Sequence, residues 1–170
     1  MARRNHPLQS EIALVLLRLV LGGVLFLAGH AKMVIIKLGG FLPVPIVGAE
    51  WQQSLPARVA SWAAENPDGA LGAIARDLII TNGALFAGLV AWTQLLVGLL
   101  LILGLWTRWA ALLAGMIAGL LAATAAIRSA GDVRVYLLLG AIALAVLIGN
   151  AGLKWGLDGW RSERRRDLDL

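Results

Sequence analysis

Four long apolar segments alternate with polar segments along this chain. They span residues 12–36, 82–105, 109–127 and 133–150. Each approaches the roughly 20 apolar residues that an α-helix needs to cross about 30 Å of hydrocarbon. The pattern therefore predicts an all-α integral membrane protein, in which four transmembrane helices form one bundle and residues 1–170 form a single membrane domain.

The connection between the second and third apolar segments is very short. Gly104 closes the first of these helices, and a Trp106-Thr107-Arg108 corner leads directly to Trp109 and the next helix. So short a connection indicates two antiparallel helices lying side by side. Tryptophan and arginine are typical of the membrane–water interface. We therefore expect Trp106, Arg108 and Trp109 to anchor this end of the hairpin.

One long connection, residues 37–81, contains four of the five prolines and so is expected to lie outside the bilayer core as an extracytoplasmic loop. Apolar residues recur in it at helical spacing: Leu55, Val59 and Trp62. Pro56 suits the first turn of a helix. These features predict a short amphipathic helix at the membrane interface, with Trp51 and Trp62 as anchors.

The composition excludes several classes of protein and of chemistry. The chain is 59% hydrophobic and 15% charged, with a mean hydropathy of +0.80, which is too apolar for a soluble domain of 170 residues. It has no cysteine, which excludes disulfides, thiolate nucleophiles and cysteine-ligated zinc or iron–sulfur clusters. The two histidines are far apart in sequence. We therefore expect no metal site and no intrinsic cofactor.

The net charge of +5 does not indicate nucleic-acid binding, because five of the fifteen basic residues lie in the tail after the last span, residues 153–170. Such a cluster is typical of the cytoplasmic, anionic lipid surface. Arg3, Arg4 and Arg108 fall on the same side if there are four spans. The positive-inside rule then places both termini in the cytoplasm and residues 37–81 outside.

Four polar residues in or near the apolar segments are candidates for a site. Arg18 lies about 9 Å inside the first span at 1.5 Å per residue, so it either faces the bundle interior or snorkels to the headgroups. Lys32 follows on nearly the same helical face, and His30 points to a different side near the outer boundary. We expect Gln94, at a depth close to that of Arg18, to accept a hydrogen bond from the guanidinium.

This polar pair has two interpretations. It is either structural glue between two helices or the polar end of a site for a carbonyl-bearing, lipid-soluble ligand. Neither interpretation assigns a catalytic residue.

Several stretches resemble the DoxX/DoxD family of small four-helix membrane proteins. They are Arg18 with residues 22–32, residues 82–91 with 95–98, residues 108–112, and the closing Gly156-Leu157-Asp158. The positions that carry the resemblance include Gly22, Gly29, Asn82, Gly98, Gly104 and Asp158. The resemblance implies a multi-pass protein of a prokaryotic cell (inner) membrane.

The family name derives from the membrane part of a thiosulfate:quinone oxidoreductase, and other members are accessory proteins of membrane redox complexes. The resemblance thus implies quinone or lipid contact near Arg18, Gln94, Lys32 and His30. It also implies partners among the membrane lipids, other membrane subunits or further copies of the chain, and an extracytoplasmic redox protein. The family commonly has glutamate where Gln94 stands, and glutamine cannot release a proton.

Two functions follow from the resemblance. The first is an accessory or scaffold subunit of a respiratory or photosynthetic electron-transfer complex. The second is a quinone-reactive oxidoreductase subunit of the thiosulfate:quinone type. Transport of a small solute is disfavoured, because four spans with so few polar groups offer little material for a pathway.

Overall fold

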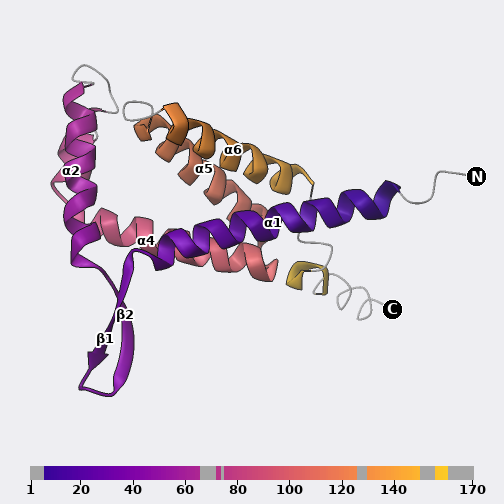
Figure 1. The fold of residues 1–170 in the computed structure, drawn as a ribbon, viewed down its shortest axis with the longest axis horizontal. Coiled ribbons are helices and arrows are strands. Elements are labelled where there is room, and N and C mark those ends of the chain that lie inside the picture. The colour runs from indigo at the N-terminus through magenta and orange to yellow at the C-terminus, as the bar shows by residue number, and fades with distance from the viewer. Residues whose placement is uncertain (1–5, 66–71, 74, 126–129, 150–155, 161–170) are drawn as a thin grey trace, which may run out of the picture. The chain divides into compact units, whose positions relative to one another are not determined.

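The computed structural model describes residues 6–65, 72–73, 75–125, 130–149 and 156–160 (Figure 1). The predicted basic clusters at Arg3 and Arg4 and at Lys154, Arg161, Arg164, Arg165 and Arg166 lie outside the described residues. The chain forms two compact units. The first unit combines Met1–Leu27 with Leu96–Leu170, and the second unit is Ala28–Leu95.

The first apolar segment is a helix only in part. Helix α1 spans His6–His30, and a strand, β1, follows at Met33–Leu38 and pairs antiparallel with β2 at Leu42–Val47. The predicted span of residues 12–36 is therefore wrong at its carboxyl end. The apolar run continues past His30, but its β-branched residues favour a pleated strand, and length alone does not separate the two structures.

The predicted loop between the first two spans contains regular structure in the second unit. Helix α2 spans Ala49–Glu65, and a π-helix, η1, spans Ala75–Ile80. The two elements pack together around Val59 and Ala63. The sequence suggested that Pro56 lies in the first turn of this helix. It lies instead inside α2, which begins at Ala49.

Contacts outside the helix explain the early start of α2. The Trp51 indole N–H donates to the Ala87 carbonyl oxygen at 3.1 Å, and Gln52 Nε2 donates to the Val47 carbonyl oxygen at 3.2 Å. These contacts hold the turns that precede Pro56 in helical form.

Within the described residues, three further long helices follow: α4 at Gly83–Leu103, α5 at Thr107–Ala125 and α6 at Ala130–Ile148. Among the described residues, three segments are long and apolar enough to cross a membrane: Glu11–His30, Gly83–Leu103 and Gly131–Ile148. Helix α5 is apolar over Thr107–Ala122 but shorter. Apolar helices of this length indicate a membrane protein.

The first unit has an apolar core to which α1, α4, α5 and α6 all contribute. Its buried members are Leu21, Leu25, Val97, Leu101, Ala110, Ala111, Ala114, Ala143 and Val146. Small residues allow α5 and α6 to lie side by side, with Gly115 near Ala143 and Gly140 near Ala118 (Figure 1). Close packing of small residues is the usual way in which membrane helices associate.

Candidate functional site

A buried polar contact joins the end of α1 to the middle of α4 in the second unit. Lys32 lies in the turn after α1, and its Nζ donates hydrogen bonds to the Ala28 carbonyl oxygen at 2.7 Å and to Gln94 Oε1 at 2.8 Å. Gln94 is only 3% exposed. Gly29 allows the close approach, because a Cβ there would lie 2.5 Å from the Leu95 nitrogen. The contact satisfies an amide in apolar surroundings.

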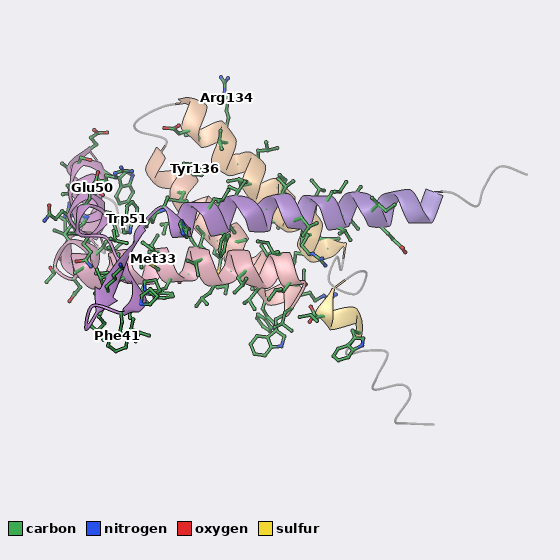
Figure 2. The ribbon with its side chains drawn as sticks, turned by 60° about the horizontal axis from the view of Figure 1, so that its bottom comes forward. Met33, Phe41, Glu50, Trp51, Arg134 and Tyr136 are labelled. Atoms are coloured by element: carbon green, nitrogen blue, oxygen red, sulfur yellow. The ribbon has the colours of Figure 1, made fainter. Side chains whose placement is uncertain are left out.

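Two cations share the indole ring of Trp51, which projects from α2 (Figure 2). Lys32 Nζ lies 4.7 Å from the ring centroid, and Arg58 Cζ lies 5.8 Å from it. Lys32 lies beyond the membrane-spanning part of α1, and burial, followed by the charge of Arg58, lowers its pKa below the usual lysine range. Cation–π attraction of about 0.5–2 kcal/mol per contact offsets part of the repulsion between the cations. We call Lys32, Gln94, Trp51 and Arg58 the Lys32 cluster.

The predicted hydrogen bond from Arg18 to Gln94 is replaced by the bond from Lys32. Arg18 belongs to the first unit, where it is 2% exposed, and a Cβ at Gly104 would lie 2.7 Å from its Nη1. The carboxylate of Asp158 attracts its guanidinium. Depth counted from the helix ends suggested the Arg18 pairing, whereas close glycine contacts between the helices determine which residues meet.

Asp158 caps the start of α5 from a distant part of the sequence. Its Oδ1 accepts from the Trp106 backbone N–H and its Oδ2 from the Thr107 backbone N–H, both at 2.9 Å. The Asp158 N–H in turn donates to the Gly104 carbonyl oxygen at 3.0 Å. The φ angles of 65° at Gly104 and 48° at Trp106 are left-handed, as the tight corner requires. Asp158 thus has a structural role as a helix cap.

Replacing Asp158 with alanine should lower the free energy of unfolding by about 1–2 kcal/mol, because two N–H groups at the start of α5 lose their acceptors. The measurement is reversible unfolding in bicelles. Asp77→Ala is the matched control, since this carboxylate is exposed on η1. A loss at Asp158 no larger than the loss at Asp77 would contradict the capping role.

The other residues selected from the sequence lie mostly at the surface or at the ends of helices. His30 is the exposed last residue of α1. Trp106 and Trp109 are 63% and 69% exposed, and Arg108 is exposed beside them, as interfacial anchors would be. Trp62 packs half-buried between α2 and η1. Asn82 Nδ2 donates to the Leu78 carbonyl oxygen at 3.0 Å, just before α4.

Arg58 is a member of the Lys32 cluster that the sequence interpretation missed. It follows Trp51 by seven residues, which is close to two helical turns and places both side chains on one face of α2. That spacing was visible in the sequence. The sequence did not show that Lys32 lies close to these residues, because this proximity depends on how α2 packs against the start of α4.

The described residues contain no group of three histidine, aspartate or glutamate side chains placed to hold a metal ion.

The family model DoxX matches residues 13–129, which is more than half of the chain. A search of curated proteins and a search of solved structures found no match. The matched range includes α1 from residue 13 onward, the hairpin, α2, η1, α4 and α5.

Proposed function

Because the chain belongs to the DoxX family, we propose that it is an accessory or scaffold subunit of a membrane electron-transfer complex, respiratory or photosynthetic. The observation that carries this proposal is that the principal polar side chains are used within the chain. Lys32 and Gln94 join α1 to α4, and both carboxylate oxygens of Asp158 cap α5. Polar groups engaged in this way stabilise helix packing and are not free to react.

The surface of the helices supports the same proposal. Large apolar side chains of α4 are exposed along its length, including Leu85, Leu89, Leu96 and Leu103. In a membrane, such a face contacts lipid or the helices of another subunit. Membership of the DoxX family supports a location in the inner membrane of a prokaryote. The charge distribution along the chain supports both termini in the cytoplasm.

A quinone-reactive subunit of the thiosulfate:quinone oxidoreductase type is the second candidate. The observation that favours it is the pair of cations on Trp51, which have no carboxylate partner among the described residues. A small dianion such as thiosulfate would relieve the repulsion between Lys32 and Arg58. A quinone carbonyl would find hydrogen-bond donors in the same cluster.

One experiment separates the two candidates. The purified chain is reconstituted in vesicles with a quinone analogue and thiosulfate, and quinone reduction is followed by absorbance. In parallel, the gene is deleted and the amount of assembled redox complex in the native membrane is measured. The scaffold proposal predicts no turnover by the isolated chain and a several-fold loss of assembled complex.

Turnover by the isolated chain would overturn the scaffold proposal. If that turnover were lost in Arg58→Gln and kept in Arg134→Gln, the second candidate would be favoured. Both arginines are exposed, so neither substitution should disturb the fold, and Arg134 lies on α6 in the first unit (Figure 2).

A further inference from the structure

The β1–β2 hairpin has one face that consists only of aliphatic side chains. The register pairs Val34 with Ile46, Ile36 with Val44, and Leu38 with Leu42. Side chains of directly paired residues share a face, and alternate residues along each strand do so as well. Five of these six side chains are 37–59% exposed, and Val44 is half-buried. We call these six residues the aliphatic face.

The opposite face of the hairpin is different in composition. It carries Lys37, the charged residue of the two strands, both strand prolines, Pro43 and Pro45, and the apolar Met33, Ile35 and Val47. Val47, at its base, is only 8% exposed, whereas Ile35 is 65% exposed, so only the base of this face is buried. The aliphatic face, by contrast, is interrupted by neither a charge nor a proline, and its exposed side chains need another cover.

The edges of the hairpin resist pairing with another strand. Pro43 and Pro45 have no N–H, so the outer edge of β2 lacks two of the donors that an added strand would use. Lys37 places a charge on β1, the other edge strand. The edge carbonyl groups still require hydrogen bonds, which excludes the hydrocarbon core as their environment.

We propose that the aliphatic face lies in the boundary between lipid headgroups and acyl chains, at the membrane surface where α1 ends. Only Ala31 and Lys32 separate the last residue of α1 from β1, so the hairpin begins at that surface. The aliphatic face has no hydrogen-bonding side chain, whereas protein interfaces carry about one hydrogen bond per 100–200 Å². Water in the headgroup layer satisfies the strand edges. Phe41, 83% exposed at the tip, extends the apolar surface (Figure 2).

The absence of cysteine allows a direct test with single-cysteine variants of the full chain. Ile36→Cys labels the aliphatic face, and Ile35→Cys labels the opposite face with the same residue type one position away. Each variant is spin-labelled and reconstituted, without other proteins, in vesicles of phosphatidylcholine and phosphatidylglycerol. Collision rates are measured with oxygen, which concentrates in lipid, and with a water-soluble nickel complex. Leu89→Cys on α4 is the lipid-exposed standard.

The proposal predicts that the label at position 36 collides with nickel several-fold less often than the label at position 35, while its oxygen collision rate approaches that at position 89. Equal nickel collision rates at positions 35 and 36 would overturn it. Low collision rates with both reagents at position 36 would also overturn it, because a protein surface would then cover the face. Val34→Cys repeats the test if the Ile36 variant does not reconstitute.

Discussion

Gly98→Ala should lower the free energy of unfolding by about 1–3 kcal/mol, the range for overpacking a well-packed interior. A Cβ at Gly98 would lie 2.4 Å from the Phe26 nitrogen, 2.7 Å from its Cα and 2.8 Å from the Gly22 carbonyl oxygen. These are backbone atoms, so no side-chain rotation relieves the overlap. Helix α1 must move away from α4, and the neighbouring core residues Leu25 and Val97 lose contacts.

Gly88→Ala is the control for this prediction, because Gly88 lies on the same helix and a Cβ there meets nothing within 4 Å. Helix propensity alone favours alanine by about 1 kcal/mol, so the Gly88 variant should be as stable as the original chain or more so. Both variants are unfolded by steric trapping in lipid bicelles. Equal changes in the free energy of unfolding of the two variants would contradict the requirement for glycine at position 98.

The family resemblance selected several glycines but did not give the function of each. Gly22, Gly29, Gly98 and Gly104 were selected from the family resemblance, and small residues generally permit close helix contact. In the structure the first three allow α1 and α4 to approach, whereas Gly104 turns the chain with a φ of 65° beside Arg18. Which of these roles a glycine has depends on helix register, which no local pattern encodes.

The hairpin shows a different limit of sequence interpretation. Residues 33–36 continue the apolar run of α1, and a run this short is compatible with helix or strand. The β-branched Val34, Ile35 and Ile36 and the following Gly39-Gly40 pair were the available signals for a strand and a turn. Gly39 and Gly40 adopt φ angles of 64° and 82°, which is the conformation that this turn requires.

Two of the candidate residues selected from the sequence, Lys32 and Gln94, meet in the structure. Lys32 and Gln94 were both selected as buried polar residues, because a polar side chain among apolar ones is costly unless it has a partner. Their pairing could not be predicted, since the sequence interpretation extended the first helix beyond Lys32. That extension placed the Lys32 side chain on the same helical face as Arg18. The helix in fact ends at His30, which allows the Lys32 side chain to turn back toward Gln94.

Lys32→Met should lower the free energy of unfolding by about 1–3 kcal/mol, because the buried Gln94 amide oxygen then lacks its donor. Methionine keeps most of the length of the side chain, so the loss reports the hydrogen bond more than the packing. Lys37→Met is the control, since Lys37 is exposed on the hairpin, and it should change stability by no more than about 0.5 kcal/mol.

A double-mutant cycle with Gln94→Leu isolates the pair. Leucine removes the amide that needs a donor, so Lys32→Met should cost less in the Gln94→Leu background than in the original chain. The expected coupling energy is about 0.6 kcal/mol, the average for polar contacts between membrane helices, and at most about 1.7 kcal/mol. Additive losses in the cycle would mean that the contact between Lys32 and Gln94 contributes no stability, and the polar groups would then be available for a ligand. That result would weaken the scaffold proposal and favour the quinone-reactive alternative, because the hydrogen bond that joins α1 to α4 is the main reason for assigning the cluster a structural role.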